Sequence, residues 1–192
     1  MQNTLAFHAT QRLRPQYASV ADAALIVLGT LVLAAMAQIS IYLPFSPVPI
    51  TGQTFAVLLI GMLYGSRRGA ATVLLYLAEG AAGLPVFAGA RAGIPVLLGP
   101  TGGYLAGFVV AAYVVGFLAE QGSGQRLLNT LGTFALGSAV IYLFGVIWLS
   151  TLLGLREAVA AGVMPFLIGD AFKAVLAALL LPTVWKLIRP AE

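Results

Sequence analysis

Long apolar runs, separated by short polar or Gly/Pro-rich segments, make up almost the whole of this sequence. The first run spans about residues 18–43, which is long enough to cross a membrane as a helix. Further apolar runs cover about residues 51–64, 69–78, 104–119, 127–153 and 164–187. The pattern therefore predicts an all-α membrane protein, built as a bundle of six transmembrane helices.

Two Gly/Pro-rich stretches interrupt this pattern. Three prolines (Pro44, Pro47 and Pro49) follow the first run and prevent a helix there. Residues 79–103 are apolar but rich in glycine and proline, and the second and third runs are short for a membrane core of roughly 30 Å. We expect non-helical backbone at membrane depth, which is tolerated where it lines a cavity, and we interpret 79–103 as a lid or binding loop.

Charge supports the membrane assignment and predicts an orientation. Only 8% of the residues are charged, against about 25% in a soluble domain. The net charge of +4 does not indicate nucleic-acid binding, because the basic residues lie in short connections between the runs. The connections on the N-terminal side hold Arg12, Arg14, Arg67, Arg68, Arg126, Lys186 and Arg189, whereas the other side holds Arg91 and Arg156. This bias predicts that both termini are cytosolic.

The sequence offers little for catalysis. It has no cysteine, and its one histidine, His8, precedes the first run, so thiolate, Ser–His and histidine-metal chemistry lack their residues. It contains no P-loop motif, so it is not expected to bind ATP itself. We expect a protein that is not an enzyme and that holds no metal and no cofactor.

One charged pair lies within a membrane run. Asp170 and Lys173 are three residues apart, so on a helix they lie on one face. The pair could neutralise itself and help helices to pack, or it could form a polar binding site inside the bundle. We favour the binding site, because charges within a membrane usually mark ligands or pathways.

Other side chains could complete such a site. Arg91 and Lys173 could bind an anionic group, and Asp170 could accept N–H donors from a ligand. Glu79 could close a short helix, pair with Arg91 or face the ligand. Neutral partners and aromatic walls could come from Gln38, Thr51, Gln53, Asn129, Tyr42, Phe45, Phe87, Tyr104, Phe108 and Tyr142. The predicted ligand is a small molecule with a carboxylate, an N–H-bearing head and an apolar tail.

Three loop motifs and the charged pair together resemble a known family. The motifs are FSPVPITGQT at 45–54, GLPVF at 83–87 and LGPTGGY at 98–104, and the pair is Asp170-x-x-Lys173. From about residue 20 to 188 the chain resembles BioY, the biotin-binding S component of energy-coupling factor (ECF) transporters.

The resemblance implies a single S-component domain over residues 1–192, in the cell membrane, that captures biotin from outside. It implies an ECF transmembrane coupling protein and ABC-type ATPase subunits as partners, so that ATP acts only through them. The site residues it implies are Asp170, Lys173 and Arg91, to which we add Gln53, Glu79, Phe87 and Tyr104. Asp170 would accept from the ureido N–H groups, whereas Arg91 and Lys173 are both candidates for the carboxylate. The resemblance leaves homo-oligomer formation open.

Three alternatives are also consistent with the sequence. The protein could be a proton-coupled secondary carrier with Asp170 as its protonation site, or an S component for another carboxylate-bearing vitamin. It could also be a structural membrane protein in which Asp170 and Lys173 only lock helices together.

Overall fold

The computed structural model describes Thr4 and residues 15–188, with side chains described for Thr4 and for 19–181. His8, Arg12, Arg14 and Arg189 lie outside the described residues. The described elements are α2 (Pro15–Gln38), β1 (Ser40–Ile41), β2 (Ile50–Thr51), α3 (Gln53–Tyr64), α4 (Ser66–Ala81), α5 (Ile94–Leu98), α6 (Gly102–Glu120), η1 (Ser123–Gln125), α7 (Leu127–Leu153), α8 (Leu155–Gly162) and α9 (Leu167–Ile188). The predicted all-α bundle is confirmed, and its main helices are α2, α3, α4, α6, α7 and α9.

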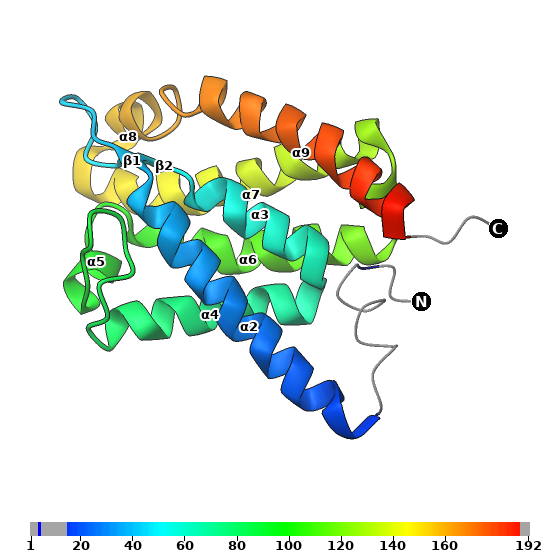
Figure 1. The fold of residues 1–192 in the computed structure, drawn as a ribbon. Helices are drawn as coiled ribbons and strands as arrows, with labels where there is room; N and C mark the ends of the chain where they lie inside the picture. Colours follow the sequence, from blue (N-terminus) through cyan, green and yellow to red (C-terminus); the bar gives the residue numbers. More distant parts are fainter. Residues whose placement is uncertain (1–3, 5–14, 189–192) are drawn as a thin grey trace.

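The main helices alternate in direction along the bundle (Figure 1). The α3–α4 turn, η1 and the end of α9 lie at one end, and the β-strands, α5 and α8 lie at the other. Helices long and apolar enough to span a membrane are Ser19–Gln38, Gly102–Glu120 and Leu127–Leu153. The pair α8 and α9, bent by 47°, forms a fourth span if it is counted as one, and α3 is a shorter apolar helix.

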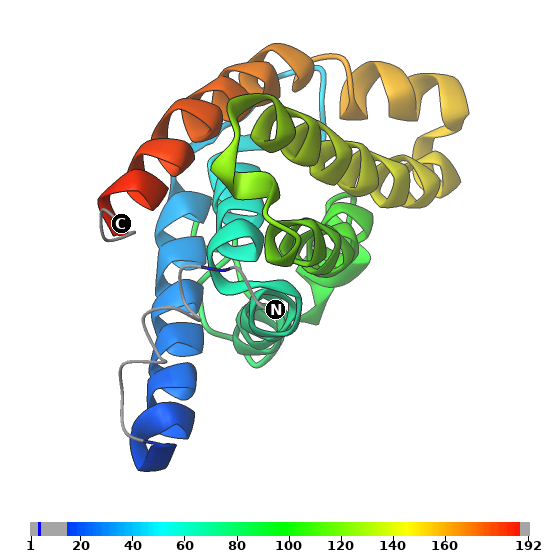
Figure 2. The same ribbon diagram turned by 90° about the vertical axis from the view of Figure 1, so that its right-hand side faces the viewer.

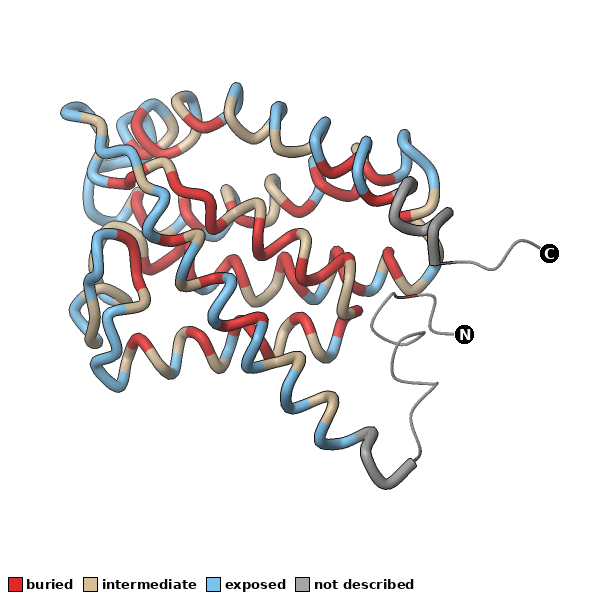
Figure 3. The backbone as a smooth tube through the Cα atoms, viewed as in Figure 1, coloured by how far each residue is buried: buried red, intermediate tan, exposed pale blue. Residues whose placement is uncertain are grey.

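The core of the bundle is centred on α6. Its span is 61% buried, whereas those of α2 and α7 are each 22% buried. Helices α3, α4 and α7 surround α6, while α2 and α9 lie outside and expose large apolar side chains (Figures 2 and 3). An apolar exposed face is what contact with lipid requires.

Several predicted boundaries were wrong for identifiable reasons. The first helix ends at Gln38 rather than near 43, because the chain pairs Ser40 with Thr51 before the proline segment. The third run is helical from Ser66 to Ala81, since Gly65 alone makes the turn at φ 87°. Helix α9 starts at Leu167 rather than near Met164, because a turn over residues 163–166 separates it from α8.

The Gly/Pro-rich stretches are only partly non-helical as predicted, because Ile94–Leu98 of the second stretch forms the short helix α5, whose first turn accommodates Pro95. Residues 42–49 and 82–93 contain no helix or named strand, and both contribute to the site described below. Ser46 holds the first stretch in place: its Oγ accepts from the backbone N–H of Val48 at 3.2 Å and donates to the carbonyl of Ala161 at 2.8 Å. The proline segment is thereby fixed against α8.

Candidate binding site

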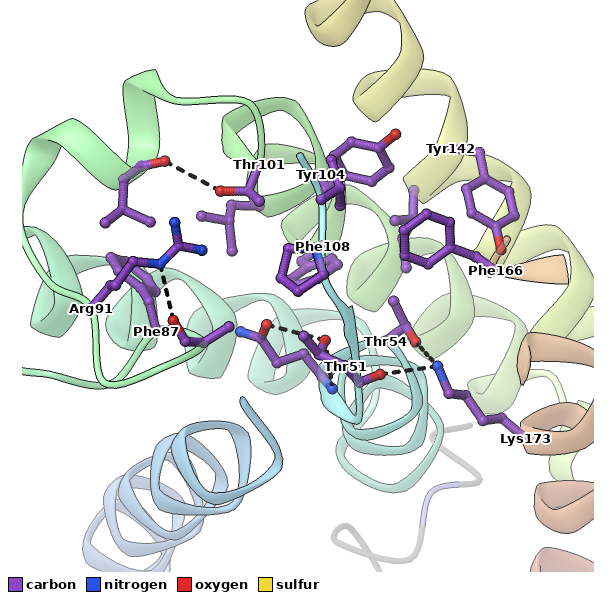
Figure 4. A pocket seen from close by; sticks show the side chains of 17 residues that line it. Thr51, Thr54, Phe87, Arg91, Thr101, Tyr104, Phe108, Tyr142, Phe166 and Lys173 are labelled. Carbon is purple, nitrogen blue, oxygen red and sulfur yellow. Dashed lines mark hydrogen bonds between the residues drawn. The ribbon is translucent and has the colours of Figure 1, made fainter. Parts of the chain in front are cut away.

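A cavity lies at the end of the bundle that carries the non-helical stretches. It measures about 580 Å³ including its open mouth. The residues that line it are Val48, Pro49, Thr51, Gln53, Thr54, Phe87, Ala88, Arg91, Val96, Thr101, Tyr104, Leu105, Phe108, Ile141, Tyr142, Phe166 and Lys173. Figure 4 shows Arg91 at one side of this cavity and Lys173 at the other, with aromatic rings between them.

The ammonium of Lys173 is held by three acceptors. It donates to the carbonyl of Thr51 at 3.0 Å, to Thr54 Oγ1 at 2.7 Å and to Asp170 Oδ1 at 2.8 Å. A lysine ammonium has three donors, so all of them are used. Its position at the cavity wall is therefore fixed from α3, α9 and the end of β2.

Asp170 lies behind Lys173 rather than on the cavity wall. Its side chain is 10% exposed, and its carboxylate accepts from Lys173, Thr54 and the hydroxyl of Tyr142. Because three donors surround it, the carboxylate is compensated for its burial. Asp170 thus connects α7, through Tyr142, to the lysine that faces the cavity.

A second chain of hydrogen bonds supports the wall formed by Phe87. Gln53 Nε2 donates to the hydroxyl of Tyr76 at 2.6 Å, and that hydroxyl donates to the carbonyl of Val86 at 2.9 Å. The rings of Tyr76 and Phe87 meet edge to face, with centroids 5.6 Å apart. Gln53 and Tyr76 therefore fix the buried ring of Phe87 from α3 and α4.

Arg91 is anchored differently from Lys173. Its Nε donates to the carbonyl of Ala88 at 3.0 Å, and Phe87 N–H donates to the carbonyl of Arg91 at 3.1 Å. Among the described residues, no group accepts a hydrogen bond from its two terminal nitrogens. Arg91 therefore presents free donors in the fork geometry that suits a carboxylate.

Comparison with known proteins identifies the family. The sequence model of the BioY family matches residues 8–190. The chain belongs to the BioY family. The biotin transporter BioY of Rhizobium etli is 43% identical over 148 residues, which cover 73% of this chain and 79% of that protein. The biotin transporter BioY of Thermotoga maritima is 42% identical over 148 residues, covering 77% of this chain and 86% of that protein.

A solved structure shares the fold of this BioY-family chain. It is described as the S-component for biotin from an ECF-type ABC transporter, and it aligns with a TM-score of 0.80 at 24% identity. The alignment covers 91% of this chain and 95% of that one. The predicted resemblance and the assignment as a multi-pass cell-membrane protein are confirmed.

The structure of this BioY-family chain brings most of the predicted site residues together. Gln53, Phe87, Arg91, Tyr104 and Lys173 all line the cavity. The hydroxyl of Tyr104 is turned to the carbonyl of Gly162 at 2.8 Å, so it is the ring that faces the cavity (Figure 4). These placements agree with the expected site, and ligand contact by these residues stays a prediction.

Other predicted residues lie elsewhere. Glu79 is not on the cavity wall: its Oε1 accepts from Thr30 Oγ1 at 3.1 Å, so it joins α4 to α2. Tyr42 and Phe45 are exposed, with 57% and 66% of their surface accessible, and neither lines the cavity. Asn129 lies in the first turn of α7, at the opposite end of the bundle.

Three residues of the site and its support were not predicted from the sequence, namely Thr54, Phe166 and Tyr76. Thr54 is part of the FSPVPITGQT motif and lies in the first turn of α3. It meets Lys173 only because α3 packs against α9. Phe166 lies just before α9, where the sequence indicated a continuous helix. Tyr76 lies within the third run, and no sequence signal pointed to its bond with Gln53.

Proposed function

We propose that this protein binds biotin in the cavity and captures it from outside as the membrane subunit of an ECF-type vitamin uptake transporter. One observation carries the proposal: a cation lies at each side of the cavity, and aromatic rings fill the wall between them. Biotin has a carboxylate at one end, a ureido ring at the other and an apolar middle, which matches this arrangement. The biotin transporters among its relatives support the same ligand.

The two cations are not equivalent, and this assigns the ends of the ligand. Lys173 has already used its three donors, whereas the terminal nitrogens of Arg91 are free. We assign the carboxylate of biotin to Arg91, which can bind both oxygens. The ureido ring then lies towards Lys173, Thr51 and Gln53.

Asp170 acts through Lys173 in this proposal. The resemblance implied direct acceptance of ureido N–H groups by Asp170, but three internal donors already contact its carboxylate. Asp170 therefore fixes the ammonium of Lys173 and the hydroxyl of Tyr142, and both of these residues line the cavity. Phe87 and Tyr104 enclose the apolar middle, and Glu79 has no ligand contact.

The energy for uptake comes from partners. We assign no catalytic step and no cofactor to this chain, and we propose an ECF transmembrane coupling protein with ABC-type ATPase subunits as partners. The shared fold with an S-component of such a transporter supports this assignment. Lipid contacts the exposed apolar faces of α2, α7 and α9.

Competition for labelled biotin tests the ligand assignment. Desthiobiotin keeps the ureido and carboxylate groups, so it should compete, whereas pantothenate and nicotinate, which carry a carboxylate without a ureido ring, should not, and neither should thiamine or riboflavin. Stronger competition by any of these four would move the protein to another vitamin. Biotin accumulation that needs no ATPase partner and collapses with a proton uncoupler would instead support the secondary carrier.

A further inference from the structure

The last residue of α2 holds the loop that carries Arg91. The side-chain amide of Gln38 donates from Nε2 to the carbonyl of Phe87 at 3.2 Å and accepts at Oε1 from the N–H of Ala90 at 3.0 Å. One amide group therefore contacts the loop on both sides of Ala88. Both bonds join residues far apart in sequence, so they fix the loop to a separate helix.

The loop needs this support because its backbone is unfavourable. Ala90 has φ 55°, a left-handed conformation that a non-glycine residue seldom adopts. A Cβ on Gly89 would lie 2.3 Å from the hydroxyl of Tyr42, so the chain that follows α2 also packs against the loop. Without Gln38, the N–H of Ala90 would lose its acceptor, and the loop would relax towards more common backbone angles.

The same segment of chain reaches the other side of the cavity. The carbonyl of Ile39 accepts from Gly52 N–H at 3.0 Å, and Ser40 pairs with Thr51. The carbonyl of Thr51 in turn accepts from Lys173. Residues 38–40 therefore contact both the 87–91 loop, which carries Arg91, and residues 51–52, next to the carbonyl that holds Lys173. The contact with the Arg91 loop is made by Gln38.

We propose that Gln38 is a positioning residue for Arg91, which it holds at the cavity by fixing the 87–91 loop to the end of α2. Its effect on biotin affinity rests on the proposed function, in which Arg91 binds the carboxylate. Gln38 itself does not line the cavity, so it acts through the loop and has no ligand contact of its own.

Two measurements on the full-length protein test this role. The first is hydrogen exchange of residues 87–91 without ligand, comparing wild type, Gln38→Ala, Gln38→Glu and the control Gln121→Ala, an exposed glutamine at the other end of the bundle. Gln38→Ala should speed exchange of the loop, and Gln38→Glu should speed it less because Glu keeps the acceptor for Ala90. Gln121→Ala should leave the loop unchanged. Equal exchange in wild type and Gln38→Ala would overturn the proposal.

The second measurement is biotin affinity in a double-mutant cycle. Gln38→Ala should weaken binding about tenfold in the wild type, but less than about twofold when Arg91 is already alanine. An equal loss in both backgrounds would show that Gln38 does not act through Arg91. If wild type itself fails to bind biotin, the proposed function fails, while the exchange comparison still decides whether Gln38 holds the loop.

Discussion

The ammonium of Lys173 lies 2.8 Å from the carboxylate of Asp170, one turn earlier on α9. The two side chains are 19% and 10% exposed, and each also contacts Thr54 of α3. The pair is therefore built into a network across α3, α7 and α9, and only its cationic member faces the cavity. A pair that served helix packing alone would have no reason to present one charge to an open cavity.

Replacing Asp170 tests how much this network contributes to binding. Asp170→Asn keeps the volume but leaves Lys173 without its charged partner, so we expect biotin affinity to fall by about 2–5 kcal/mol. Calorimetric titration would measure the loss, and helical circular dichroism would check the fold. Wild-type affinity in a folded Asp170→Asn protein would show that the pair is not part of the site. A purely structural pair would lower thermal stability in Lys173→Met with no loss of affinity.

Replacing Arg91 tests the assignment of the ligand's carboxylate. Arg91→Gln should weaken biotin binding by about 1.5–3 kcal/mol, the range for a hydrogen bond to a charged group. The same substitution should weaken the binding of biotin methyl ester much less, because the ester lacks the anionic group. The control is Arg156→Gln, which replaces an exposed arginine at the same end of the bundle. This control should change neither the affinity for biotin nor that for the methyl ester. An equal loss for the acid and the ester would contradict the carboxylate contact.

The close approach of Gly80 to Phe87 gives a packing test. A Cβ on Gly80 would lie 2.1 Å from the ring of Phe87, which is 1% exposed. Gly80→Ala should therefore displace the ring from the cavity wall and destabilise the protein by about 1–3 kcal/mol, as overpacking does. Thermal unfolding and biotin titration would measure both effects.

The matched control for this packing test is Gly132→Ala in α7, where a Cβ would meet nothing within 4 Å. This variant should keep the wild-type affinity and should melt no lower than wild type, because alanine favours a helix more than glycine does. The same outcome for Gly80→Ala would mean that the wall yields to the added methyl group without cost.

Orientation in the membrane can be tested because the chain has no cysteine. Arg67, Arg68 and Arg126 lie at the end of the bundle opposite the cavity, which predicts that this end is cytosolic. A membrane-impermeant thiol reagent should therefore label Arg156→Cys in intact cells and should label Gln121→Cys only after lysis. The reverse pattern would place the mouth of the cavity inside the cell.

The sequence was informative where single residues dictate local structure. Membrane runs followed from composition, and Pro44, Pro47 and Pro49 predicted the non-helical stretch because proline excludes a helix. The fifth helix was predicted with the observed bounds, 127–153, since the polar turn before it and the segment with Arg156 and Glu157 after it are both local signals. Lys173 and Arg91 were predicted as site residues because charged side chains are rare in an apolar chain and usually mark a ligand or a pathway.

What the sequence could not provide depends on packing between distant segments. Nothing local shows that Glu79 meets Thr30, 49 residues away, rather than Arg91 or a ligand. The turn of Asp170 away from the cavity depends on Tyr142 of α7, which lies on another helix. Gln38 was expected only as a neutral ligand partner, because its contact with the 87–91 loop exists only once α2 is placed.

The most direct test is calorimetric titration of the purified wild-type protein with biotin, after unfolding and refolding to remove any ligand that was carried through purification. We expect saturable binding of one biotin per chain, with a dissociation constant on the order of nanomolar, which corresponds to a binding free energy of about 12 kcal/mol. Absence of heat, together with no displacement of labelled biotin from protein shown to be folded, would contradict the proposal that this cavity is a biotin site.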